Sequence, residues 1–241
     1  MECSIQLYSI HKALTRENFE ENLQKIADMG YTKVEPCNFF DYSPDEINAM
    51  LAKTNLKISG THSAYRSLLE DFDATVEFHK AIGNKNYIIP HGGPLSNQEE
   101  IDAFVENVNR LQDKLAAHGI SLGYHNHSYE FRMNPDGSVP YEQIILRTDL
   151  DLEVDVFWAF VGLKNNPIQL LQRIENRIKC LHLKDGLESG KGTPLGQGDA
   201  PIAEIYDWVK EKGKFAVVEN EADPTKCLEE AKMCIDYLKT L

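Results

Sequence analysis

Two patterns of apolar residues alternate along the chain. Short runs rich in β-branched residues predict strands, and longer segments whose apolar positions recur every three or four residues predict amphipathic helices. Strands are expected at eight places: 4–9, 32–35, 56–60, 86–90, 120–124, 150–156, 178–183 and 215–218.

Helices are expected between most of these strands. Capping boxes beginning at Ser43 and Ser96 open two of them. Gly30, Gly83, Gly119 and Gly213 stand where helices commonly end. The expected helices cover 16–29, 44–54, a segment ending at 83, 97–118, 167–175, 201–212 and a last one, capped by Asp223-Pro224, that runs to 238. The one after Ser96 has an apolar face formed by Ile101, Phe104, Val105, Val108, Leu111 and Leu115.

Eight strands, each followed by helical or long-loop material, predict an α/β fold, a single (β/α)8 TIM barrel. No linker or low-complexity segment interrupts residues 1–241, which we interpret as one domain. The alternative is a doubly wound open sheet, which usually has a Gly-rich first turn, and this chain has none.

Composition narrows the class of protein. The 241 residues are 42% hydrophobic and 26% charged, with a net charge of −13, so a nucleic-acid partner is not expected. No run approaches 18 apolar residues, so no membrane span is expected, and the N-terminus has no secretory pattern. The five cysteines form no C-x-x-C pair and indicate reduced thiols in a cytoplasmic protein.

Polar side chains gather where the expected strands end. Barrel enzymes build their sites from these carboxyl ends. Five of the eight histidines lie there, with several carboxylates and one lysine: His62, His91, His125, His127, His182, Glu130, Glu153, Asp155, Glu219, Glu221 and Lys184.

Alternation along the strands predicts which of these side chains face the barrel interior. Leu181 and Leu183 face the helices, so His182 faces inward together with Cys180 and Lys184. The same argument turns Glu153 and Asp155 inward, and His125 with His127. Buried carboxylates and imidazoles at one end of a barrel are the ligands that a divalent cation binds.

The residues at the strand ends resemble the motifs of the xylose isomerase-like TIM-barrel superfamily. Its members include sugar phosphate isomerases/epimerases, ketose 3-epimerases, inosose dehydratases and the related endonuclease IV. The resemblance covers essentially the whole chain, and the strings that carry it are Tyr124-His125-Asn126-His127-x-x-Glu130-Phe131, Glu153-Val154-Asp155-x-x-Trp158, His182-Leu183-Lys184-Asp185-Gly186, Gly196-Gln197-Gly198-Asp199 and Val217-Val218-Glu219-x-Glu221.

The resemblance implies a divalent metal (Mn, Zn, Co or Mg) held by residues from strands five to eight. Carried over by position, strand six supplies Asp155, strand seven His182 and strand eight Glu219. Strand five departs from the family pattern, which has a glutamate there. We expect Glu130 as the fourth ligand, with His125 and His127 as competitors.

The same site supplies candidate catalytic and substrate-binding residues. Glu130 and Glu219 are expected to move protons, and Lys184 is either a base with a lowered pKa or a salt-bridge partner. Candidate substrate contacts are His62, His91, His125, Trp158 and Glu221.

Structural interpretations remain open for several of these residues. His62 and His91 alternatively bond neighbouring carbonyls, and Trp158 alternatively packs a helix on the barrel. Glu35 is either a substrate contact or an ion-pair partner. We expect His11, His79 and His118 to be solvated, the 186–198 loop to be a mobile lid, and the cysteines of the last helix to be core.

The predicted function is a metal-dependent sugar isomerase or epimerase that removes a proton next to a carbonyl and passes through an enediolate. The alternative is a metal-dependent lyase or dehydratase acting on a keto-sugar, keto-inositol or keto-glycoside. Trp158 favours this alternative, because it stands where ketose 3-epimerases carry a substrate-contacting histidine. A nuclease and a metal-free sugar-binding barrel fit less well. The expected partner is a small sugar-derived substrate, and self-association stays open.

Overall fold

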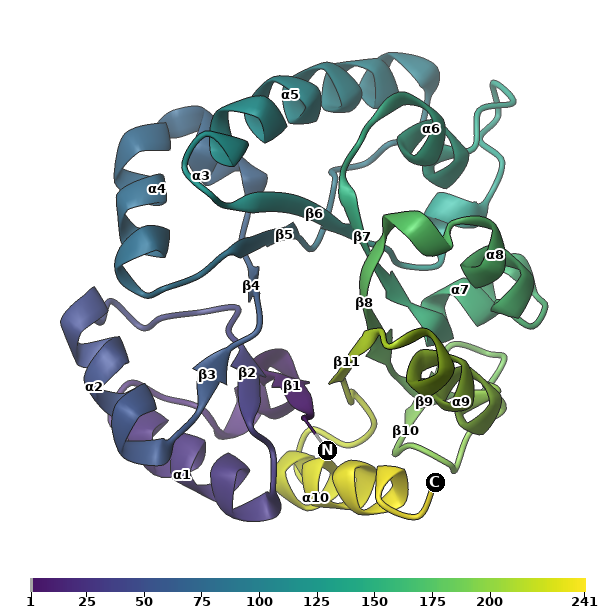
Figure 1. The fold of residues 1–241 in the computed structure, drawn as a ribbon. Helices are drawn as coiled ribbons and strands as arrows, with labels where there is room; N and C mark the ends of the chain where they lie inside the picture. The colour runs from purple at the N-terminus through teal and green to yellow at the C-terminus, as the bar shows by residue number, and fades with distance from the viewer. Residues whose placement is uncertain (1) are drawn as a thin grey trace.

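The computed structural model describes residues 2–241, and nine of its strands form one parallel sheet that curves into a barrel. Figure 1 views the barrel roughly along its axis, with the helices outside the ring of strands. The sheet order is β3-β2-β1-β11-β8-β7-β6-β5-β4. The strands are β1 (Ser4–Gln6), β2 (Lys33–Glu35), β3 (Lys57–Ile58), β4 (Thr61–His62), β5 (Asn86–Ile89), β6 (Ser121–His125), β7 (Asp151–Asp155), β8 (Ile178–Leu183) and β11 (Phe215–Val218).

The outer layer consists of ten α-helices and three 3-10 segments among the described residues. The helices are α1 (Phe19–Met29), α2 (Pro44–Thr54), α3 (Tyr65–Glu70), α4 (Phe72–Ala81), α5 (Gln98–Ala116), α6 (Pro140–Arg147), α7 (Val156–Leu163), α8 (Ile168–Arg173), α9 (Ile202–Lys212) and α10 (Cys227–Leu238). The 3-10 segments are η1 (Leu7–Ala13), η2 (Tyr129–Phe131) and η3 (Glu175–Arg177). In the part of the chain that the structure describes, no helix has the length and apolar character needed to cross a membrane.

One bent strand closes the barrel. The expected third strand divides into β3, which pairs with β2, and β4, which pairs with β5, so the nine strands form an eight-membered ring. The bend falls at Ser59-Gly60. A Cβ atom at Gly60 would lie 2.8 Å from Ile88 Cδ1 and 3.2 Å from Glu35 Oε2, so only glycine fits this close approach.

The core lies between the strands and the helices. Strand residues that face outward, such as Leu122, Leu152 and Leu181, are fully or almost fully buried under the helices. The predicted apolar face of α5 is confirmed, since its six residues are the buried ones of that helix, and Phe104 packs edge-on against Tyr124 on β6. Packing of this kind leaves the barrel interior free to carry polar side chains.

Several predicted boundaries were wrong. The capping box at Ser43 is confirmed, but the second helix cap is Asn97, whose side chain accepts from Glu100 N. The final helix begins at Cys227, after a turn in which Asp223 bonds Thr225. The predicted strand over 150–156 ends at Asp155, and α7 starts at the next residue because the Asp155 side chain caps it.

Candidate active site

The candidate site lies inside the carboxyl end of the barrel, where the predicted inward alternation is confirmed. His125 on β6, Asp155 on β7 and His182 on β8 turn toward one another, and Glu219 joins them just beyond β11. Their ligand atoms lie within 4.8 Å of one another, and all four residues are buried. We call these four residues the upper group.

The donor set of the upper group fits a divalent cation. The Asp155 Oδ1 atom accepts from Trp158 N at 2.8 Å, whereas its Oδ2 atom is buried without a hydrogen-bond partner. Burial, opposed by nearby Lys184, raises the pKa of Asp155 to about 7. A cation bound between two carboxylates and two imidazoles would supply the positive charge that this oxygen lacks.

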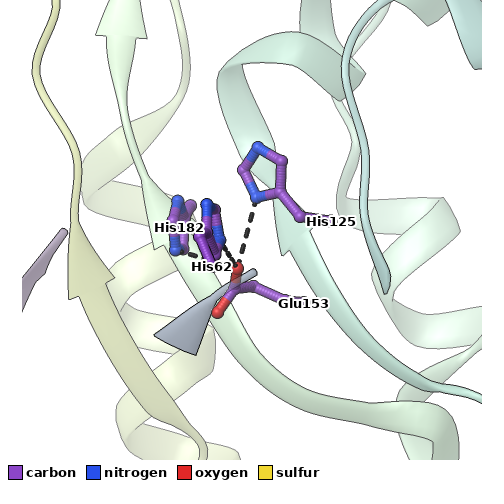
Figure 2. Close-up of side chains that lie close together, drawn as sticks. All are labelled: His62, His125, Glu153 and His182. Atoms are coloured by element: carbon purple, nitrogen blue, oxygen red, sulfur yellow. Dashed lines mark hydrogen bonds and ion pairs between the residues drawn. The ribbon is translucent and has the colours of Figure 1, made fainter. Parts of the chain in front are cut away.

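A second group lies deeper along the barrel axis and is centred on Glu153. Figure 2 shows three imidazoles, from His62, His125 and His182, turned toward one carboxylate. The Glu153 Oε2 atom lies 2.5 Å from His62 Nε2, 3.0 Å from His182 Nε2 and 3.3 Å from His125 Nδ1. We call these four residues the lower group, and they share His125 and His182 with the upper group.

The histidines of the lower group stabilise the charge of its carboxylate. Burial raises the pKa of Glu153, but His182 and His62 outweigh that effect and hold it well below its usual range. Burial lowers the pKa of His62, and Glu35 and Glu153 more than reverse this. The His62 ring is therefore an internal counter-ion, and its nitrogen contacts carboxylates rather than a backbone carbonyl.

Glu35 also belongs to this interior network. It is 1% exposed, and its Oε1 atom accepts from Gln6 Nε2 at 2.8 Å and lies 3.0 Å from His182 Nε2. Of the two interpretations given to Glu35, the structure therefore matches the ion pair.

Lys184 lies between the upper group and a cavity at the barrel mouth. Its Nζ atom is 3.8 Å from Glu219 Oε2, is in close contact with Glu221 Oε2 and lies 4.8 Å from the centre of the Trp158 ring. Burial lowers the pKa of Lys184, but Glu219, Asp155 and Glu221 together raise it above its usual value. Of the two interpretations given to Lys184, the structure therefore matches the salt bridge, because three carboxylates stabilise the ammonium form.

Glu130 lies apart from both groups. It is fully buried on η2, where its carboxylate accepts from Tyr124 Oη at 2.9 Å and from His127 N at 2.9 Å. These bonds anchor the loop after β6. Neither group of candidate ligand atoms includes Glu130, and His125 stands where the fourth ligand was expected.

Two further histidines that were predicted to contact substrate or metal lie toward the mouth of the barrel. His91 is exposed, and its Nδ1 atom accepts from Gly93 N. His127 is partly buried, with its ring centre 6.1 Å from that of Trp158, and burial lowers its pKa to about 4. The His91 and His127 rings, whose centres lie 6.0 Å apart, therefore both lie outside the upper group.

A cavity of about 630 Å³ opens beside Glu219. It is lined by Leu7, Tyr8, His11, Leu14, Cys37, Asn38, Phe40, His62, Ala64, Pro90, His125, His127, Glu219 and Glu221. The wall formed by η1 was not predicted, and His11, which we expected to be solvated, stacks on Tyr8 in this wall. The sequence pattern predicted a strand through residue 9, whereas the chain leaves the strand after Gln6 and continues as η1.

A cavity of similar size, about 640 Å³, lies at the opposite mouth of the barrel. It is lined by lysines and apolar side chains, and among the described residues neither candidate ligand group falls wholly within its walls. We therefore assign the chemistry to the carboxyl end.

The loop that follows β8 is hydrogen-bonded to the carboxylate of Asp185. The Asp185 carboxylate accepts backbone N–H groups from Gly186, Gly196, Gly198 and Ala200, and a short hairpin of β9 (Asp185–Gly186) and β10 (Gly192–Thr193) lies within the loop. The predicted mobile lid thus has a buried anchor at its base.

Comparisons with known proteins agree with this geometry. The family model described as "Xylose isomerase-like TIM barrel" matches residues 23–238. A protein named inosose dehydratase from Clostridium botulinum is 23% identical, over 88% of this chain and 85% of its own. Another of that name, from Clostridium beijerinckii, is 25% identical with the same coverage.

Solved structures share the whole architecture. A protein called sugar phosphate isomerase/epimerase from Parabacteroides distasonis superposes with a TM-score of 0.87 at 26% identity, covering 100% of this chain and 98% of the other. A probable 3-DHS dehydratase from Bacillus anthracis has a TM-score of 0.74 at 15% identity, with 98% and 99% covered, and this likeness extends to the fold alone.

Proposed function

Because the chain belongs to the xylose isomerase-like TIM barrel family, we propose that it is a divalent-cation-dependent carbon–oxygen lyase. It removes a proton next to a carbonyl of a keto-inositol or keto-sugar and then eliminates a β-hydroxyl as water. The observation that carries the proposal is the upper group, buried beside a cavity large enough for a sugar-sized substrate.

The upper group has the ligand set for the cation. His125, Asp155, His182 and Glu219 would hold it, and Asp155 Oδ2 has no competing partner. When bound, a cation polarises the substrate carbonyl and stabilises the enolate that proton removal creates.

Glu219 and Lys184 are the proposed proton carriers. The Glu219 carboxylate takes the carbon-bound proton, a carbon–carbon double bond forms, and the β-carbon–oxygen bond breaks. The Lys184 ammonium gives its proton to the departing hydroxide, so that water leaves, and the proton held by Glu219 restores Lys184 across 3.8 Å. Proton donation to the departing hydroxide needs Lys184 protonated at the start, and the three surrounding carboxylates favour that form.

The position of Glu130 favours elimination over epimerisation. An epimerase of the predicted type uses two carboxylates on opposite faces of the substrate, and Glu130 was the expected second one. Its carboxylate is instead bonded to Tyr124 and to the His127 backbone. Glu219 lines the cavity and the Lys184 ammonium lies 3.8 Å from its carboxylate, an arrangement that suits a base and an acid for loss of water.

The names of the relatives support the same choice. The two clostridial proteins are called dehydratases of inososes, which are keto-inositols. The second candidate function is sugar isomerase or epimerase, which is what the 26% identical protein from Parabacteroides distasonis is called.

The deciding experiment incubates the Mn²⁺-loaded protein with an inosose and a panel of keto-sugars in D₂O. Loss of one water from a substrate, followed by mass spectrometry, supports the lyase. Incorporation of one deuterium without loss of water supports the epimerase instead. Neither event with any member of the panel contradicts the proposal.

Two buried carboxylates provide a matched pair of variants. Asp155→Asn removes a proposed ligand and is expected to abolish stoichiometric Mn²⁺ binding. Glu130→Gln is expected to retain Mn²⁺, because its carboxylate lies outside the upper group. Loss of Mn²⁺ in Glu130→Gln but not in Asp155→Asn would reverse the ligand assignment.

A further inference from the structure

His125 and His182 each lie between the upper and the lower group. The His182 ring places Nδ1 2.9 Å from Glu219 Oε2 and Nε2 3.0 Å from Glu153 Oε2. The His125 ring places Nε2 4.0 Å from Asp155 Oδ2 and Nδ1 3.3 Å from the same Glu153 oxygen. Opposite nitrogens of the two rings therefore face a single carboxylate.

A neutral imidazole has one N–H group and one lone pair, and only the lone pair binds a metal. A carboxylate that accepts from one ring nitrogen fixes the proton there and leaves the other nitrogen free. We propose that Glu153 is a positioning residue that sets the His125 tautomer and, together with Glu35, the His182 tautomer, so that His125 would bind the cation through Nε2 and His182 through Nδ1. This inference rests on the proposed function, because it concerns the same cation.

Glu153 is held firmly enough for this role. It is 1% exposed, and its second oxygen, Oε1, accepts from Cys180 Sγ at 3.0 Å. Cys180 is its register partner on β8, so the contact follows from strand pairing. The Oε2 atom also contacts His62 Nε2, and the His62 ring stacks on that of His182 with their centres 5.1 Å apart (Figure 2).

The sequence position of Glu153 explains how one residue reaches both histidines. It stands two residues before Asp155 on β7, so both side chains face inward one layer apart. Its strand lies between β6, which carries His125, and β8, which carries His182. A carboxylate at this place in the central strand contacts a ligand from each neighbour.

Glu35 supplies a matched control. Its Oε1 atom lies 3.0 Å from His182 Nε2 and 3.1 Å from His62 Nε2, the same two nitrogens that Glu153 contacts. In the part of the chain that the structure describes, however, Glu35 has no hydrogen bond or ion pair with His125. Removing the Glu35 charge therefore leaves the His125 tautomer in place, whereas removing the Glu153 charge releases the His125 tautomer and leaves His182 Nε2 paired with Glu35.

The test uses the full-length ¹⁵N-labelled protein loaded with Zn²⁺, read by long-range ¹H–¹⁵N spectra of the imidazoles. The expected spectrum of the parent has Nε2-bound His125 with a proton on Nδ1, and Nδ1-bound His182 with a proton on Nε2. The opposite tautomer at either residue overturns the inference. This reading comes from the parent protein alone and needs no variant.

Zn²⁺ affinity, measured by competition with a chelator, gives the second reading. Glu153→Gln is expected to weaken Zn²⁺ binding about 10- to 100-fold, as loss of an outer-shell partner usually does, and to release the His125 tautomer. Glu35→Gln is expected to leave that tautomer unchanged. A folded Glu153→Gln protein with the affinity and tautomers of the parent refutes this inference alone, whereas a parent that binds no Zn²⁺ refutes the proposed function as well.

Discussion

His79 provides a direct test of how burial controls the acid stability of this barrel. The residue lies on α4, where we expected a solvated side chain, but it is 4% exposed. Its Nδ1 atom accepts from Asn84 Nδ2 at 3.0 Å, and its ring packs edge-on against Tyr87 at 4.8 Å. Protonation would place an N–H group against the Asn84 donor and a charge in a buried site.

Burial lowers the pKa of His79 from 6.5 to about 4. That difference corresponds to about 3 kcal/mol of preference for the neutral ring in the folded protein. Because the unfolded chain takes up the proton first, the stabilisation is complete above pH 6.5 and is lost as the pH falls toward 4. Between pH 7 and pH 5 the loss amounts to about 2 kcal/mol of unfolding free energy.

The assay is urea unfolding of the parent and of His79→Gln at a series of pH values. Glutamine keeps an acceptor for Asn84 but cannot titrate, so the stability difference between the two proteins should shrink by about 2 kcal/mol from pH 7 to pH 5. The exposed His118→Gln is the matched control and should follow the parent. A difference between parent and His79→Gln that stays constant over this range would refute the argument.

Three further perturbations test other parts of the fold. Asp185→Ala should release the loop that the Asp185 carboxylate anchors. Trypsin should then cleave faster after the exposed Lys191, and an unchanged cleavage rate would contradict the anchoring. Tyr124→Phe removes a donor from buried Glu130 and should lower the unfolding free energy by about 1–3 kcal/mol in urea; no change would mean that the bond contributes nothing. Gly60→Ala should cost about 1–3 kcal/mol in the same assay, because its Cβ lies 2.8 Å from Ile88 Cδ1, and a neutral result would mean that the bend relaxes freely.

The regular parts of the fold were predictable because local patterns determine them. The alternation on β8 correctly separated His182 and Lys184 from Leu181 and Leu183, since a strand has a strict two-residue period. The capping box at Ser43 likewise marked the start of α2 within one residue. Both signals depend only on neighbours in sequence.

The features that the sequence did not reveal depend on contacts between distant segments. Asp155 is at once a strand end, a helix cap and a candidate ligand, and the apolar run after it looks the same in a strand and in a helix. Glu130 was assigned to the cation from its place in a motif, but a tyrosine on the preceding strand accounts for its position. His79 was misjudged because burial depends on which face of α4 meets the barrel.

The bent strand at Ser59-Gly60 makes one part of the ring easier to open than the rest. β3 and β4 have two residues each, whereas β7 and β8 have five and six. Transient local unfolding begins where backbone pairing is sparse, so the amides of β3 and β4 should exchange with deuterium before those of β7 and β8. His62 lies on β4, so each such opening would draw its ring away from Glu153 and briefly admit water to the barrel axis.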